Sequence, residues 1–171
     1  SLNLKQVGQM LWAGQGVTAD WGGRAAPSAK SAYPLTLYLV AYKVVDLAPG
    51  IYQYLPGVRD ALHQIQLIKS GDLHEALGEA IGQNAAKNPP AIIIITGDME
   101  IMAKTFDNVR RDNNVYLEVG HAAQNLYLQA ESLGLGMVTM AGFNGNKVRS
   151  VLNIPEKDTI IYAIPFGIPK P

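Results

Sequence analysis

Residues 118–144 read EVGHAAQNLYLQAESLGLGMVTMAGFN and predict more of the fold than any other stretch of the chain. The pattern indicates a long helix, a glycine stop, a short apolar strand and a second glycine turn. At about 100° per residue, one apolar stripe of the helix contains Val119, Ala122, Ala123, Leu126, Ala130 and Leu133. The opposite face is less polar than a solvated face and carries Leu117, His121, Gln124 and Leu128. We therefore expect this helix to lie between its own sheet and another body, such as a second subunit.

The turn at residues 140–144 exposes backbone beside the apolar side chains of Met140 and Phe143. Gly142 has no side chain, so a ligand can approach the main chain closely there. Such a surface suits a flat aromatic cofactor.

Length and charge limit the possible classes of protein. The 171 residues form a single predicted domain, 1–171, large enough for a substantial core. Lysine plus arginine and aspartate plus glutamate number 14 each, so the net charge is zero. No basic field is present to hold nucleic acid or an anionic membrane, and we expect neither as a partner. The absence of cysteine excludes disulfides and thiol catalysis, and it fits a cytoplasmic protein.

No targeting or membrane segment is visible in the sequence. The longest unbroken apolar run, residues 91–95, has the length of a buried strand and is far too short to span a bilayer. The N-terminus shows no basic region followed by an apolar segment, as a signal peptide would. The chain begins at Ser1 and not at methionine, which fits the removal of a segment upstream.

The remaining elements are predicted from periodicity and capping residues. Helices are expected over residues 4–14, with Asn3 as cap, and over 61–69, 73–83 with Asp72 as cap, 98–106, 115–133 and 144–152. Strands are expected over residues 35–45, 50–55, 92–96, 137–140 and 159–166. Helices and strands mix without a strict βαβ rhythm, which favours an α+β fold over a doubly wound sheet.

Common catalytic and metal motifs are missing from the chain. His63, His74 and His121 are isolated, so no metal site is predicted. Residues 134–136 read GLG but follow a helix, whereas a dinucleotide-binding turn opens one. No nucleophile elbow or phosphate-binding lysine loop is present, and we assign no catalytic residue.

Two loops could bind a ligand through small polar groups. In residues 18–34, Arg24 could hold a phosphate, and Ser28 and Ser31 offer hydroxyl donors. A plain surface loop and a disordered loop are the alternatives for this segment. Gln83, with Asn84 beside it, could hydrogen-bond the edge of a heterocycle or serve only as a helix C-cap.

Short motifs follow one another in a characteristic order along nearly the whole chain. They are residues 11–17 (LWAGQGV), 26–29 (APSA), 33–34 (YP), 49–54 (PGIYQY), 120–126 (GHAAQNL), 133–136 (LGLG), 141–143 (AGF) and 165–169 (PFGIP). In this order they resemble the FMN-dependent nitroreductase family. The resemblance is closest to its azoline-oxidase-like branch, the dehydrogenases of thiazole/oxazole peptide maturation.

The resemblance implies a nitroreductase-like α+β fold, with a central, mostly antiparallel sheet flanked by helices. It also implies a homodimer with FMN in two interface clefts, in which the long helix packs against its symmetry mate. The residues that match the loop along the flavin, in part from the partner subunit, are Pro27, Ser28, Ala29 and Ser31. Gln83 matches a side chain that contacts the pyrimidine end of the flavin ring. The turn that faces the flavin and donates an N–H toward N5 is matched by Met140, Ala141 and Gly142.

The implied activity is ping-pong hydride transfer through the flavin. The donor would be NADH or NADPH, and the acceptor a small organic molecule such as a nitroaromatic compound or a quinone. Two alternatives stay open: an azoline-oxidase-type dehydrogenase of a peptide heterocycle, and a non-catalytic flavin-binding protein without a phosphate clamp.

One part of the family pattern is missing from the sequence. The family opens with an arginine-rich segment that holds the FMN phosphate, and nothing like it precedes Leu4. Three explanations remain: a trimmed start, replacement by Arg24 and Lys170, or weak FMN binding. The variable cleft segment corresponds to residues 98–114, where Arg110 and Arg111 could attract an acidic substrate or be solvated helix-end charges.

Overall fold

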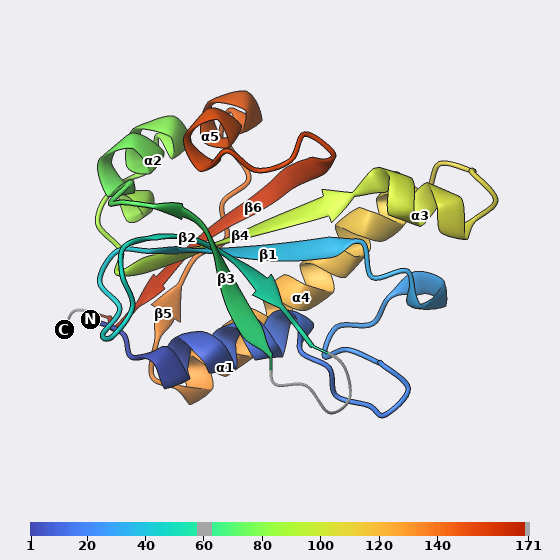
Figure 1. Ribbon diagram of the computed structural model, residues 1–171, viewed down its shortest axis with the longest axis horizontal. Helices are drawn as coiled ribbons and strands as arrows, with labels where there is room; N and C mark the ends of the chain where they lie inside the picture. Colours follow the sequence, from blue (N-terminus) through green and yellow to red (C-terminus); the bar gives the residue numbers. More distant parts are fainter. Residues whose placement is uncertain (58–62, 170–171) are drawn as a thin grey trace.

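The computed structural model describes residues 1–57 and 63–169 and shows an α+β protein with a single six-stranded sheet (Figure 1). The strands are β1 Leu35–Ala41, β2 Gly50–Leu55, β3 Gln64–Ser70, β4 Ala91–Asp98, β5 Gly136–Met137 and β6 Asp158–Gly167. Their order is β3-β2-β1-β4-β6-β5, and all five pairings are antiparallel. The helices are α1 Leu4–Gln15, α2 His74–Ile81, α3 Met99–Thr105, α4 Asp112–Ser132 and α5 Gly145–Leu152. Two short 3₁₀ turns complete the fold, η1 Ala29–Ser31 and η2 Asn84–Ala86. The predicted fold class is confirmed.

The strand β4 forms the centre of the protein. All eight of its residues are buried, as expected for a β-branched run that is covered on both faces. Alternate side chains point to opposite sides, so Ile93 and Ile95 join one core cluster while Ile92 and Ile94 join the other.

The helices cover both faces of the sheet in two pairs. α1 and α4 pack together on one face, and α2 and α5 pack together on the other (Figure 1). The molecule therefore has three layers with a separate apolar core on each side of the sheet. No helix in the described ranges is long and apolar enough to cross a membrane.

Side-chain caps fix the beginnings of three helices, and the cap at Asn3 is as predicted. Asn3 forms a capping box with Gln6 at α1. Asp98 accepts two backbone hydrogen bonds at the start of α3, and Asn144 does the same at α5. Each cap stabilises its helix by about 1 kcal/mol.

The helix predicted over residues 61–69 is wrong in its described part. Residues 64–70 form β3, which pairs with β2 at the edge of the sheet; residues 61–62 lie outside the described ranges. The segment Gln64–Lys69 alternates polar and apolar residues for much of its length, which is a period of two. Its residues are also tolerated in helices, so the short pattern was misassigned.

Three element boundaries differ from prediction because local hydrogen bonds intervene. β1 ends at Ala41, since the N–H groups of Tyr42 and Lys43 both donate to the carbonyl of Pro90. Asp72 does not occupy the N-cap position of α2, although its carboxylate accepts from the N–H of His74 at 3.0 Å. The strand predicted over residues 137–140 is divided into β5 and an isolated bridge between Met140 and Ala163.

The helix α4 has the two faces that its sequence predicts. On the sheet side Val119, Ala123 and Leu126 are at most 4% exposed. A Cβ atom at Gly97 would lie 2.4 Å from Cγ1 of Val115, so this glycine permits the close approach of α4 to β4. The other face leaves exposed apolar side chains, with Leu117 at 62% and Leu128 at 63% exposure.

Candidate functional site

The turn between β5 and α5 has backbone groups available to a ligand. Met140 is buried and pairs with Ala163 through two 3.0 Å hydrogen bonds, which fixes the start of the turn. Ala141 and Gly142 are exposed, and within the described part of the chain neither N–H donates to a protein acceptor. The Gly142 carbonyl accepts from Nε2 of Gln83 at 3.3 Å. The structure thus brings together two of the predicted site segments, which are far apart in the sequence.

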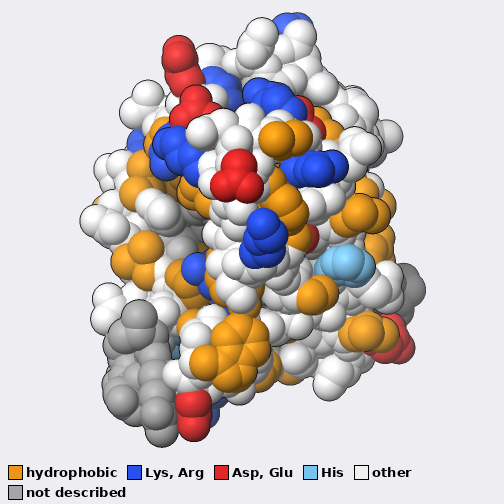
Figure 2. All heavy atoms as spheres, turned by 90° about the vertical axis from the view of Figure 1, so that its right-hand side faces the viewer, with side chains coloured by type: hydrophobic (Ala, Val, Ile, Leu, Met, Phe, Trp, Pro, Cys, Tyr) orange, Lys and Arg blue, Asp and Glu red, His pale blue; other side chains and the backbone are white. Residues whose placement is uncertain are grey.

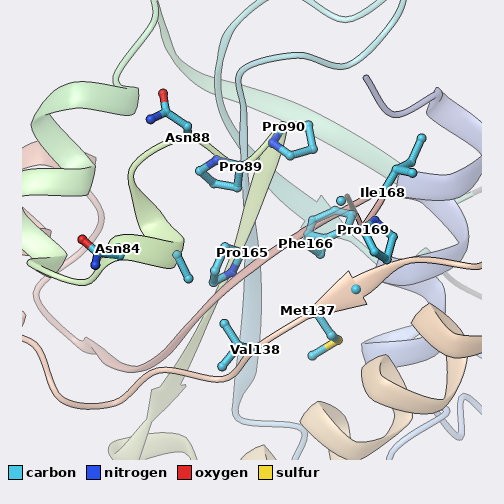
Figure 3. Close-up of a pocket in the computed structure, with 13 residues that line it drawn as sticks. Asn84, Asn88, Pro89, Pro90, Met137, Val138, Pro165, Phe166, Ile168 and Pro169 are labelled. Carbon is cyan, nitrogen blue, oxygen red and sulfur yellow. The ribbon is translucent and has the colours of Figure 1, made fainter. Parts of the chain in front are cut away.

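An apolar recess of about 360 Å³ lies where β5 and β6 meet the segment around η2 (Figure 3), and its lining residue Asn84 follows Gln83 in the sequence. The labelled residues that line it are Asn84, Asn88, Pro89, Pro90, Met137, Val138, Pro165, Phe166, Ile168 and Pro169. Its walls are mainly proline and aliphatic side chains, and Asn84 and Asn88 supply amide groups. Volumes of this order are typical of small-molecule sites.

The loop before β1 is held by a network of its own. The guanidinium of Arg24 donates to Oε1 of Gln15 at 2.9 Å and lies 4.6 Å above the ring of Tyr33. Burial lowers the pKa of Arg24 from its ordinary value. Ser28 Oγ accepts a hydrogen bond from the N–H of Tyr33 at 2.7 Å. The loop is therefore defined by specific hydrogen bonds and packs against the protein.

A buried carboxylate on α4 contacts the same loop. Oε1 of Glu118 accepts a hydrogen bond from the N–H of Ala29 at 2.8 Å, and Glu118 is only 5% exposed. Burial raises the pKa of Glu118, while the Ala29 N–H, the Ser28 side chain and His121 oppose that rise. Sequence analysis did not single out Glu118. Its spacing from Val115 and Ala122 places it on the buried face of the helix, which was a usable signal.

The structure divides the predicted site residues between the two faces of the sheet. Ala29 packs against the core under α1 and α4, together with the loop that carries Arg24, Pro27, Ser28 and Ser31. Met140 belongs to the core under α2 and α5, and Ala141, Gly142 and Gln83 lie on that side. Within one protomer these two sets do not form one site. Lys170, predicted as a phosphate contact, lies outside the described residues.

The turn between α3 and α4 meets the loop at one end of the molecule. Lys30 Nζ lies 4.4 Å from the ring centroid of Phe106, and the Arg111 guanidinium lies 5.7 Å from the same centroid. Arg110 instead forms an ion pair with Asp112. Figure 2 shows this end of the molecule, where basic side chains gather among hydrophobic ones. Of the two arginines in the predicted cleft segment, Arg111 contacts the Phe106 ring that Lys30 of the loop also contacts.

The chain is thus an α+β domain with an apolar recess at the edge of its sheet. The model of the nitroreductase family matches residues 1–168. A predicted nitroreductase of Methanocaldococcus jannaschii is 34% identical over 164 residues, which cover 95% of this chain and 80% of that protein. The chain belongs to the nitroreductase family.

Solved structures agree with this fold. The Escherichia coli microcin synthetase McbBCD complex with truncated pro-MccB17 bound contains a chain with TM-score 0.80 and 18% identity, and the match covers 100% of this chain and 65% of that one. The NADPH:FMN oxidoreductase of Vibrio harveyi complexed with NAD⁺ has TM-score 0.65 and 18% identity, and the match covers 98% of this chain and 60% of that one. At these identities the likeness shows the shared fold.

Proposed function

We propose that this protein is an FMN-dependent oxidoreductase that works by ping-pong hydride transfer. Bound FMN would supply the redox chemistry, accepting hydride from NADH or NADPH and passing it to a small nitroaromatic or quinone-like acceptor. Membership of the nitroreductase family supports an oxidoreductase, and the fold shared with an NADPH:FMN oxidoreductase supports flavin as the cofactor.

The observation that carries the proposal is the pair of free backbone donors on the turn that Gln83 holds; Asn84, which follows Gln83 in the sequence, lines the apolar recess. A flavin ring has a broad apolar body and a polar edge, so it needs flat contact together with a few donors and acceptors. The N–H groups of Ala141 and Gly142 are unpaired in the described part of the chain, and Gln83 holds the turn that presents them. The residues present therefore fit the ring.

The chain's own groups have limited tasks in this reaction. The Ala141 and Gly142 N–H groups would donate to the ring and favour negative charge on it. No general base is needed because no side chain has to remove a proton from carbon. None of the described residues that line the recess is charged, so the FMN phosphate would be held outside it.

Visible spectroscopy tests the proposal directly. The purified protein, supplied with FMN and separated from free flavin, should be yellow, with a flavin band near roughly 450 nm. This band should disappear when NADH or NADPH is added anaerobically. A nitroaromatic acceptor or a quinone should then restore the colour. A protein that stays colourless with added FMN would overturn the proposal.

An azoline-oxidase-type dehydrogenase is the second candidate. The fold shared with a chain of the McbBCD complex, with its truncated pro-MccB17, supports this alternative. It would be preferred if the yellow protein were not reduced by either nicotinamide but were reduced by an azoline-containing peptide. A protein that binds FMN yet is reduced by neither donor would instead indicate a non-catalytic flavin-binding protein.

A further inference from the structure

The backbone of the loop before β1 is strained next to the predicted flavin contacts. Lys30, Ser31 and Tyr33 have φ values of 50°, 54° and 47°, in the left-handed region that residues with side chains rarely adopt. Each such residue costs conformational free energy, and it persists only where surrounding contacts hold it. The contacts that hold this loop therefore determine how its N–H groups and hydroxyls are presented.

Besides the ring contacts of Tyr33 and Lys30, hydrogen bonds hold the strained segment. Within the loop, Ser28 Oγ accepts from the Tyr33 N–H at 2.7 Å. At the outer end, Lys30 Nζ reaches the carbonyl of Thr105, a long contact of 3.5 Å at an exposed position. On the inner side, the N–H of Ala29 donates to Glu118 at 2.8 Å, and the Ser28 side chain also contacts this carboxylate. Glu118 is the buried member of this set, and it belongs to a regular helix.

The other buried carboxylates have structural tasks that Glu118 does not share. Asp98 caps α3 and pairs with Lys157, and Asp158 accepts a hydrogen bond from the Tyr38 hydroxyl at 2.6 Å. Glu118 forms no ion pair with a lysine or arginine of residues 1–57 or 63–169. Its acceptor oxygens are used for the loop, although an apolar residue would be less costly to bury on this face of α4.

We propose that Glu118 is the positioning residue of the flavin site, which fixes the loop of Pro27, Ser28, Ala29 and Ser31 against α4 in the conformation that contacts the cofactor. This inference rests on the proposed function and adds a residue to it. Glu118 itself does not touch the flavin; it acts through the Ala29 N–H and the Ser28 side chain. When the carboxylate is removed, the partly buried N–H of Ala29 loses its acceptor and the left-handed residues relax.

The experiment compares Glu118→Ala and Glu118→Gln with Glu131→Gln, an exposed position on the same helix that serves as the matched control. Amide hydrogen exchange of residues 25–33 reports the loop, and exchange of β4 reports global stability. The Kd for FMN is measured by quenching of flavin fluorescence. In Glu118→Ala, we expect loop exchange to increase about tenfold with unchanged β4 exchange, and FMN to bind about tenfold more weakly.

Glu118→Gln keeps an acceptor oxygen of nearly the same reach, so it should restore most of the loop protection and of the FMN affinity. This rescue separates positioning from a general packing defect, which the amide would not repair selectively. The control Glu131→Gln should match the wild type in both measurements.

Separate measurements test the proposed function and the role of Glu118. A wild-type protein that binds no FMN overturns the proposed function, whereas unchanged loop exchange in Glu118→Ala overturns the inference whatever the wild type binds. A loosened loop with unchanged FMN affinity would also overturn it.

Discussion

Gly142 lies in the candidate turn and has room for a side chain in the single chain. An added Cβ atom would come no closer than 3.7 Å to Nε2 of Gln83, and the backbone of Gly142 is not in the left-handed region. The fold alone therefore does not require glycine at this position.

Gly142→Val tests whether the turn faces the flavin. We expect the variant to unfold with nearly the wild-type free energy, but to bind FMN about tenfold more weakly, because the side chain would cover the backbone donors. Gly145→Val is the control, since an added Cβ atom there meets nothing within 4 Å. Titration with FMN and urea unfolding would measure the two effects. Equal FMN affinity in Gly142→Val and the wild type would count against the predicted contact.

Glu118 also makes a prediction about stability and pH. Its pKa is raised in the folded protein, chiefly by burial, from an ordinary value of 4.5. The folded state thus binds this proton more tightly than the unfolded chain does. The resulting stabilisation is present below the unfolded pKa and is lost as the pH rises through the folded pKa.

Glu118→Gln removes this titration. The variant should be more stable relative to the wild type at about pH 7 than at about pH 4, so its free energy of unfolding minus that of the wild type should rise with pH above the unfolded pKa. Urea unfolding across this range measures the difference, and Glu131→Gln provides the baseline. A difference between Glu118→Gln and wild type that does not vary with pH would show that the carboxyl pKa is the same in both states.

At the scale of elements, the cap of α5 connects helix stability with the candidate site. Oδ1 of Asn144 accepts from the N–H groups of Asn146 and Lys147, and Asn144 lies two residues after Gly142. Loss of the cap should loosen both the first turn of α5 and the turn before it.

Asn144→Ala should lower the free energy of unfolding by about 1 kcal/mol and weaken FMN binding. Asn3→Ala is the matched control, because it removes the same type of cap from α1, away from the candidate turn. It should cost a similar amount of stability with no change in FMN affinity. If both variants weakened FMN binding equally, the effect would come from general destabilisation and not from the turn.

The elements also show which features are predictable from sequence. α4, β4 and the three capped helices follow from patterns that are long or chemically specific, such as the isoleucine run at residues 92–95. β3 was missed because seven residues with mixed propensities do not separate a helical from an extended period. At the site, the family resemblance pointed to Gln83 and Gly142, and in the structure the Gln83 side chain donates to the Gly142 carbonyl. Glu118 was missed because its role depends on a hydrogen bond across 89 positions, which no local pattern reveals.

At the scale of the whole molecule, the exposed apolar face of α4 remains the strongest feature in favour of a homodimer. Leu117 and Leu128 are both more than 60% exposed in the single chain. A second copy that covers this face would account for their apolar character, and it could bring the loop of one protomer to the recess of the other.

Leu128→Asp should convert the dimer to a monomer and abolish tight FMN binding, because a charge at an apolar interface is costly to bury. Leu67→Asp is the control: Leu67 is 50% exposed, but it lies on the edge strand β3. Sedimentation velocity would measure the oligomeric state of both variants. A wild type that sediments as a monomer while it binds FMN tightly would contradict the predicted dimer.

The placement of the loop and the turn on opposite faces of the sheet has a genetic consequence. In a dimer whose sites each combine the loop of one chain with the turn of the other, a defect in the loop and a defect in the turn need not fall in the same site. Two different alleles, each inactive alone, would assemble into mixed dimers in which one site carries both defects and the other carries neither. Such alleles would complement each other in a cell that expresses both.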